Sequence, residues 1–165
     1  MRSILADEVT FGTKIAALQP SLLQLHGRES PDRVRSIKAR FNLPVMKAIA
    51  IEQAADLAEI SRYAGVADRL LFDARAPRDA TRPGGLGRSF DWRLLERLDP
   101  GVPFMLSGGL DAGNVAEALR ITRAQGVDVS SGVERSPGEK DPDKIRAFVV
   151  AAREAYQALT AVVNE

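Results

Sequence analysis

Short apolar runs alternate along the chain with longer stretches in which apolar residues recur at helical spacing. This alternation is typical of βα units, in which helices connect parallel strands. The pattern predicts strands at 21–26, 44–49, 69–73, 103–107 and 127–131, each followed by a helix candidate. We therefore expect an α/β fold built on a parallel sheet.

Capping residues mark where the helices are expected to begin. Asp141 and Ser30 are each followed by proline, which is favoured at the first helical position, and both are expected to be N-caps. Asp111 is the expected N-cap of another helix, and a further one is expected at about 7–18. The buried face of the last helix is predicted to hold Ile145, Phe148, Val149, Ala152, Tyr156 and Leu159.

Alternate positions of each strand point to opposite faces of the sheet and differ in character. One set is apolar, Phe72 for example, and is expected to face the helices. The other set is mixed, and its polar members, Asp73 among them, gather at the C-terminal ends of the strands, where parallel sheets build their sites. Lys47 and Asp128 are assigned to this interior set, where an ion pair is an alternative to substrate contact.

Composition narrows the classes of function. The 165 residues, 45% of them apolar and 27% charged, are expected to form one domain over 1–165. A net charge of +1 argues against nucleic acid or a membrane surface as partner. Zero cysteines exclude disulfides, thiolate metal sites and a cysteine nucleophile within this sequence. No stretch resembles a signal peptide or a membrane span, so a cytoplasmic location is expected.

Glycine-rich segments suggest a phosphate site. Two successive strands end in Ser107-Gly108-Gly109 and Ser130-Ser131-Gly132, and each segment leads toward a helix. Paired loops of this kind resemble the phosphate site after strands 7 and 8 of a (β/α)₈ barrel, because glycine lets backbone N–H groups approach an anion. The long segment 74–89, which contains Gly84, Gly85 and Gly87, can fold over a ligand in the same way. The alternative is that these glycines only turn the chain.

Two side chains at strand ends are candidates for chemistry. Asp73 ends an apolar strand, so it is expected in a partly desolvated site suited to a general acid, or else it caps the backbone of its own loop. His26, the only histidine, lies at another strand end before Gly27 and has either a ligand or orienting role or that of a hydrogen-bonded structural histidine.

Taken together, these segments resemble phosphoribosylanthranilate isomerase, a (β/α)₈ barrel enzyme of tryptophan biosynthesis. The resemblance runs in family order from about residue 6 almost to the C-terminus, and the ordered set is highly specific. The matching segments are LLQLHG at 22–27, PVMKAI at 44–49, LFD at 71–73, GGLGRSFDW at 84–92, LSGGL at 106–110 with Asn114-Val115, and VDVSSGVE at 127–134 with Gly138 and Lys140-Asp141.

The resemblance implies an Amadori rearrangement, in which N-(5-phosphoribosyl)anthranilate becomes 1-(2-carboxyphenylamino)-1-deoxyribulose 5-phosphate, with no cofactor or metal. It implies that Asp73 is the general acid that protonates the ring oxygen. It further implies that His26 and Asp128 line the site. The implied phosphate and substrate contacts are Gly84, Gly85, Gly87, Ser107, Gly108, Gly109, Ser131 and Gly132.

One departure from the family pattern concerns the start of the barrel. Counting back from strands 7 and 8 makes 21–26 strand 4, so the chain corresponds to about strand 3 through helix 8 of an incomplete TIM barrel. Roughly 45 to 60 residues of the first two βα units are then missing. These units would carry the family's general base, a cysteine, and an arginine that holds the anthranilate.

The open edges of such a sheet predict self-association, or completion by an N-terminal segment supplied separately. The alternative function is an inactive phosphosugar-binding half-barrel that needs such a segment.

Overall fold

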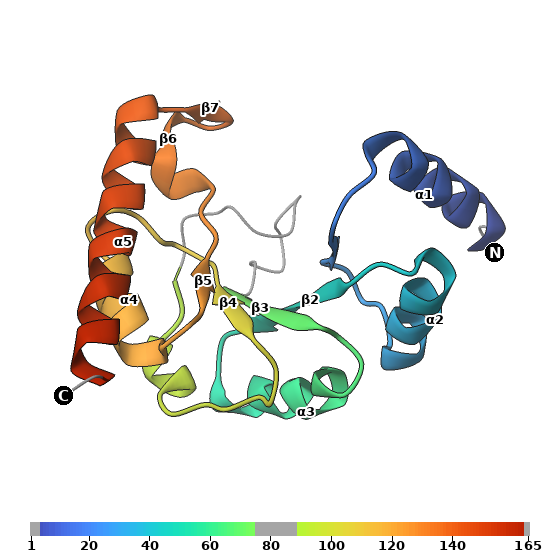
Figure 1. Ribbon diagram of the computed structural model, residues 1–165, viewed down its shortest axis with the longest axis horizontal. Coiled ribbons are helices and arrows are strands. Elements are labelled where there is room, and N and C mark those ends of the chain that lie inside the picture. Colours follow the sequence, from blue (N-terminus) through green and yellow to red (C-terminus); the bar gives the residue numbers. More distant parts are fainter. Residues whose placement is uncertain (1–3, 75–88, 164–165) are drawn as a thin grey trace.

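The computed structural model describes residues 4–74 and 89–163. Its centre is a five-stranded parallel sheet in the order β1-β2-β3-β4-β5 (Figure 1). Strands adjacent in sequence are adjacent in the sheet, as in a barrel wall. The strands are β1 (Leu23–Leu25), β2 (Val45–Ile51), β3 (Arg69–Ala74), β4 (Phe104–Leu106) and β5 (Gly126–Val127).

All five predicted strands are confirmed, although β5 is shorter than expected. Residues 131–133 leave the sheet as the 3₁₀ helix η3 (Ser131–Val133). The ladder between β4 and β5 ends at the hydrogen bond that the Asp128 N–H donates to Leu106 O, at 2.9 Å.

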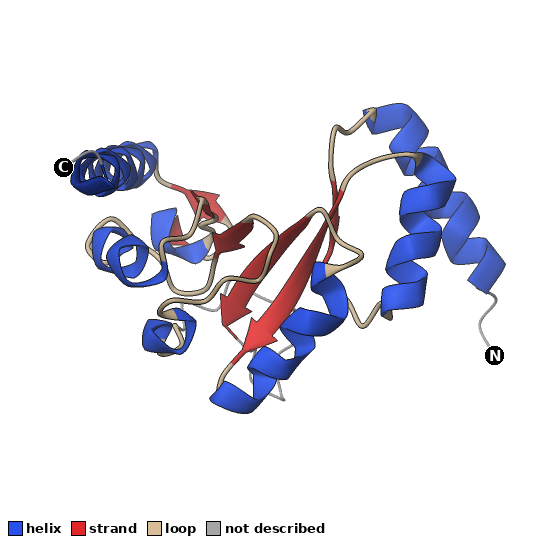
Figure 2. Ribbon diagram, turned by 60° about the horizontal axis from the view of Figure 1, so that its bottom comes forward, coloured by secondary structure: helices blue, strands red, loops and turns tan. Residues whose placement is uncertain are grey.

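Helices surround the outer side of the sheet as an arc. In Figures 1 and 2, α1 and α2 lie at one end of the sheet, α4 and α5 at the other, and α3 lies between. The helices are α1 (Ile4–Leu18), α2 (Pro31–Phe41), α3 (Ala58–Ala64), α4 (Val115–Thr122) and α5 (Pro142–Val163), with 3₁₀ helices η1 (Ala54–Leu57) and η2 (Trp92–Leu95).

Two of the three expected N-caps are confirmed. Ser30 Oγ accepts a hydrogen bond from the N–H three residues later. The Asp141 carboxylate accepts from the N–H groups two and three residues later, and these bonds hold the pKa of Asp141 below its usual value. The Asp111 prediction was wrong by three residues: Asp111 closes the preceding turn, and Asn114 is the N-cap of α4.

The two faces of the sheet have the predicted difference in character. The helix-facing core includes Leu25, Val45, Ile49, Leu70, Phe72 and Leu106, all buried. The interior face carries a smaller apolar cluster of Met46, Ala48 and Leu71, with Leu22 and Met105 packed against it.

Lys47 was assigned to the wrong face. The register pairs Leu23 with Val45 and Leu25 with Lys47, so Lys47 shares the helix-facing side with Val45 and Ile49. The prediction failed because a charged residue among apolar ones was assumed to face the polar interior.

The predicted buried face of α5 was only partly correct. Phe148 and Ala152 are buried, but Ile145 and Val149 remain 40% and 38% exposed. Helix α5 packs against α4 and η3 at one end of the arc, so positions flanking its contact line stay open (Figure 1).

An antiparallel hairpin that the sequence did not predict precedes α5. It consists of β6 (Glu134–Ser136) and β7 (Glu139–Lys140), and Gly138 supplies the positive φ of +84° in its turn.

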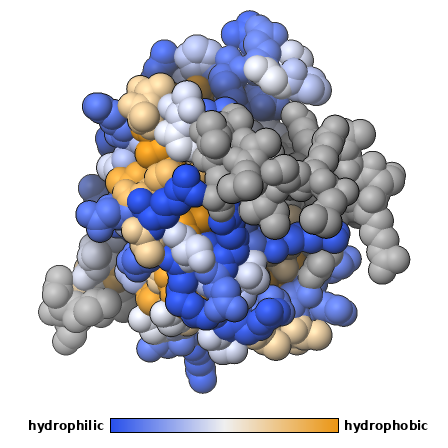
Figure 3. Space-filling model, turned by 90° about the vertical axis from the view of Figure 1, so that its right-hand side faces the viewer, coloured by the Kyte–Doolittle hydropathy of each residue, from blue (hydrophilic) through white to orange (hydrophobic). Residues whose placement is uncertain are grey.

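The opposite end of the molecule, around α1 and α2, shows apolar side chains among hydrophilic ones (Figure 3). Within 4–74 and 89–163, none of the helices has the length and apolar character needed to cross a membrane.

Candidate active site

Polar side chains gather at the carboxyl edge of the sheet. Asp73 lies near the end of β3, His26 directly follows β1, and Ser107 directly follows β4. Because the strands are parallel, these ends share one edge. Asp73 is 4% exposed and Ser107 is 9% exposed, whereas the side chain of His26 is 35% exposed. The edge therefore combines a buried carboxyl group with a solvent-accessible imidazole.

His26 and Asp73 are in direct contact. His26 Nε2 lies 3.3 Å from Asp73 Oδ2, and Gln24 Nε2 lies 3.4 Å from His26 Nδ1. The Asp73 carboxylate thus approaches one ring nitrogen of His26, and the Gln24 amide approaches the other. The structure therefore places His26 beside Asp73, and the role of His26 stays a prediction.

Asp128 accepts a hydrogen bond from Ser107 Oγ at 3.3 Å. Lys47, which the sequence pattern also assigned to the interior face, forms no ion pair with the described residues there. Lys47 pairs instead with Glu29 Oε2 at 3.2 Å on the helix side of the sheet. Asp128 thus adds a second carboxylate to the same edge as Asp73.

The glycines of the two serine–glycine segments are required by close backbone contacts. Gly108 and Gly109 have φ of +88° and +67°, and a Cβ atom at Gly108 would lie 2.5 Å from Ala74 N. A Cβ atom at Gly132 would lie 1.9 Å from the carbonyl oxygen of Leu110. The absence of Cβ atoms therefore lets the ends of β3, β4 and β5 pack together.

The same segments also contribute backbone N–H donors. Within the described ranges, the N–H groups of Gly108 and Gly109 have no hydrogen-bond partner. Ser131 and Gly132 lie in the first turn of η3, where N–H groups lack partners within the helix. Asn114 Nδ2 holds the carbonyl of Gly109 at 2.9 Å. Such donors suit an anion.

The remaining predicted glycines, Gly84, Gly85 and Gly87, lie outside the described residues. Sequence reasoning did not predict the contacts of Lys140, whose Nζ lies 2.8 Å from the carbonyl oxygen of Ser130 and 2.8 Å from Glu134 Oε1. Only the hairpin of β6 and β7 brings Lys140 to this segment. No group of three His, Cys, Asp or Glu side chains within the described part of the chain is placed to hold a metal ion.

Comparison with known proteins identifies the relatives of this chain. The family model described as N-(5'phosphoribosyl)anthranilate (PRA) isomerase matches residues 7–151. This chain belongs to that family.

Curated relatives of the chain carry the same name. The N-(5'-phosphoribosyl)anthranilate isomerase of Bradyrhizobium sp. (strain ORS 278) is 65% identical over 152 residues, which cover 92% of this chain and 69% of that protein. The isomerase of Nitrobacter winogradskyi is also 65% identical, over 93% of this chain and 68% of that protein.

Solved structures of the family agree with the fold. The phosphoribosylanthranilate isomerase of Thermotoga maritima matches with a TM-score of 0.72 and 33% identity, over 85% of this chain and 65% of that one. A second isomerase structure, in complex with reduced 1-(o-carboxyphenylamino)-1-deoxyribulose 5-phosphate, matches with a TM-score of 0.67 and 32% identity, over 85% and 63%. The sheet is thus of the TIM-barrel type, and the chain spans about two thirds of its isomerase relatives.

Proposed function

We propose that this chain supplies the acid and phosphate-binding part of an active site for the Amadori rearrangement of N-(5-phosphoribosyl)anthranilate. The observation that carries the proposal is the buried Asp73, whose Oδ2 lies 3.3 Å from His26 Nε2, on the edge that also carries the serine–glycine segments. An acid beside an anion cradle matches a phosphosugar substrate whose ring must be opened.

In the proposed reaction, the Asp73 carboxyl group donates its proton to the ribose ring oxygen. The bond between C1 and that oxygen breaks, and the nitrogen lone pair forms a C1–N iminium. Loss of the C2 proton to a general base then gives an enolamine, which tautomerises to the ketone. His26 orients the Asp73 carboxyl group, and the N–H groups near Gly108 and Gly132 hold the phosphate.

The proposed reaction also needs a general base. The family resemblance assigns it to a cysteine, and this sequence contains none. The alternative function is a phosphosugar-binding half-barrel that needs a complementing N-terminal segment. The two candidates differ in whether the chain turns over substrate when the residues of the first two βα units are supplied.

An assay of the full chain tests the proposal. Loss of phosphoribosylanthranilate fluorescence is followed with the chain alone and with an added polypeptide that spans the first two βα units of the Bradyrhizobium relative. We expect isomerisation in the mixture, and a loss of about 10²- to 10⁴-fold in Asp73→Asn. Asp143→Asn is the matched control, because the Asp143 side chain is 86% exposed on α5.

Undiminished turnover in Asp73→Asn would remove Asp73 from the mechanism. A folded mixture that binds the reduced product analogue without turnover would establish the half-barrel instead. Product binding should survive in Asp73→Asn, because the phosphate contacts proposed here are backbone groups.

A further inference from the structure

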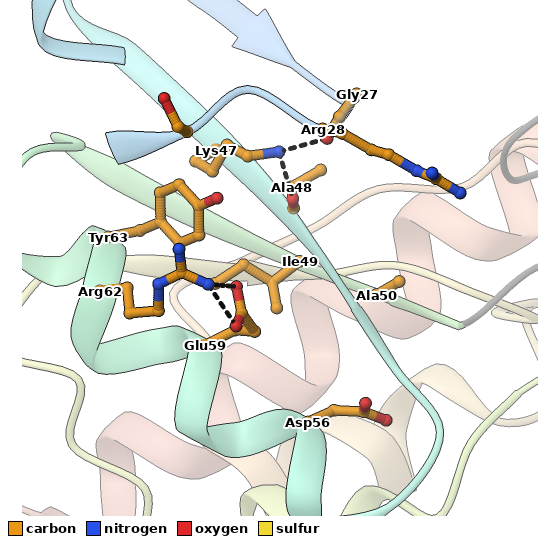
Figure 4. A pocket seen from close by; sticks show the side chains of 11 residues that line it. Gly27, Arg28, Lys47, Ala48, Ile49, Ala50, Asp56, Glu59, Arg62 and Tyr63 are labelled. Atoms are coloured by element: carbon orange, nitrogen blue, oxygen red, sulfur yellow. Dashed lines mark hydrogen bonds and ion pairs between the residues drawn. The ribbon is translucent and has the colours of Figure 1, made fainter. Parts of the chain in front are cut away.

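Lys47 is a buried charged residue of β2, on the helix-facing side of the sheet. Its exposure is 3%, and its Nζ lies 5.5 Å from the ring centroid of Tyr63. It borders a cavity of about 540 Å³ that Arg62 and Glu59 also line (Figure 4). Burying an ammonium group is costly unless every donor is used and the charge is balanced.

The three donors of the ammonium group meet three backbone carbonyl groups. Nζ lies 2.9 Å from Gly27 O, 2.9 Å from Ala48 O and 3.4 Å from Leu25 O. Figure 4 shows the bonds to Gly27 and Ala48. Two of these carbonyls, those of Leu25 and Gly27, belong to the residues on either side of His26.

These bonds lie where β1 and β2 separate. The last pair in their ladder is Leu25 with Lys47, and β2 continues to Ile51. Beyond that pair, carbonyl groups that face the gap need another donor. Lys47 supplies it and so ties the diverging end of β1 to β2.

Glu29 completes the arrangement from the other side. Its carboxylate lies 3.2 Å from Lys47 Nζ and accepts from the Gly27 N–H at 3.1 and 3.2 Å. Burial, and then the negative charge of Glu59, raise the pKa of Tyr63, so its hydroxyl stays protonated and donates to Glu29 O at 2.8 Å. Both peptide groups that flank His26 are therefore anchored.

We propose that Lys47, together with Glu29, is a positioning device that fixes the end of β1 so that the His26 imidazole meets the Asp73 carboxyl group. Lys47 Nζ contacts the carbonyl groups of Leu25 and Gly27, and it acts on His26 through this backbone. The catalytic consequence rests on the proposed function, whereas the geometric statement stands by itself.

The single histidine allows a direct test by NMR. Long-range ¹H–¹⁵N spectra of the ¹⁵N-labelled full chain show one imidazole, because the sequence contains one histidine. The chemical-shift change that Asp73→Asn causes at His26 Nε2 is measured in the wild-type and Lys47→Met backgrounds. We expect this change to be at least about twofold smaller in Lys47→Met, as for coupled residues in a double-mutant cycle.

Lys38→Met is the matched control. Lys38 Nζ also pairs with an aspartate, Asp68 Oδ1 at 2.6 Å, but it lies on α2 and makes no bond next to His26. This control should leave the response of His26 to Asp73→Asn at its wild-type size. An undiminished response in folded Lys47→Met would overturn the proposal.

If Lys47→Met does not fold, Glu29→Gln provides the same test. It removes the carboxylate that joins Lys47 Nζ to the Gly27 N–H, so a diminished response supports the proposal and an undiminished one overturns it. In the isomerase mixture, Lys47→Met should lower kcat by about 10- to 100-fold with little change in KM. A mixture without activity but with the expected NMR response would refute the proposed function and leave the positioning inference standing.

Discussion

Replacing Gly132 with alanine separates two reasons for a glycine at the phosphate segment. If only a bound anion needs the space, the variant should fold normally and lose affinity. The structure points to a second reason, since the new Cβ would lie 1.9 Å from Leu110 O and 2.9 Å from Leu110 C. Real Cβ contacts essentially never fall below 3.0 Å, so the shortfall of 3.0 minus 1.9 is 1.1 Å.

The atoms in the way are backbone atoms, so no side chain can rotate to relieve the contact. Overpacking of this kind costs about 1–3 kcal/mol, and we expect Gly132→Ala to lower the unfolding free energy by about 2–3 kcal/mol. Urea unfolding without any ligand, followed through the single tryptophan, Trp92, measures this value.

The control is Gly65→Ala. Gly65 has a φ of −86°, and a Cβ added there meets nothing within 4 Å. Its unfolding free energy should stay the same or rise by up to about 1 kcal/mol. If Gly132→Ala unfolds within about 0.5 kcal/mol of the wild type yet binds phosphate more weakly, the packing argument is refuted and the space serves the anion alone.

Two further predictions concern charged side chains. Burial pushes the pKa of Asp68 up, but bonds from Lys38 Nζ and the Val45 N–H outweigh it and hold that pKa below its usual value. A carboxylate with a lowered pKa stabilises the fold above its unfolded-state pKa, so Asp68→Asn should cost about 1–2 kcal/mol at pH 7. That cost should fade in urea titrations below about pH 4; a pH-independent cost would contradict the reasoning. Lys140→Met removes the brace on Ser130 and should weaken inorganic phosphate binding about 3- to 10-fold by calorimetry, with little loss of stability because Lys140 is half-exposed. Unchanged affinity for phosphate would show that the contact of Lys140 with Ser130 does not contribute to phosphate binding.

Local patterns in the sequence predicted the framework of the fold. Apolar runs of strand length located all five strands, because a strand of a parallel sheet that is covered on both faces consists mainly of apolar residues. Capping chemistry likewise located the starts of α2 and α5, since it depends only on residues within one turn. The position of Asp73 at a strand end, on the interior face, was predictable for the same reason.

The contacts that define the site depend on residues far apart in the chain. The contact of His26 with Asp73 spans β1 to β3, and the reason for glycine at 132 is a carbonyl of Leu110 in another loop. The sequence pattern also placed Lys47 on the wrong side of the sheet, because it assigned charged residues to the interior face. Register and loop packing are set by many weak contacts at once, so only the tertiary structure decided them.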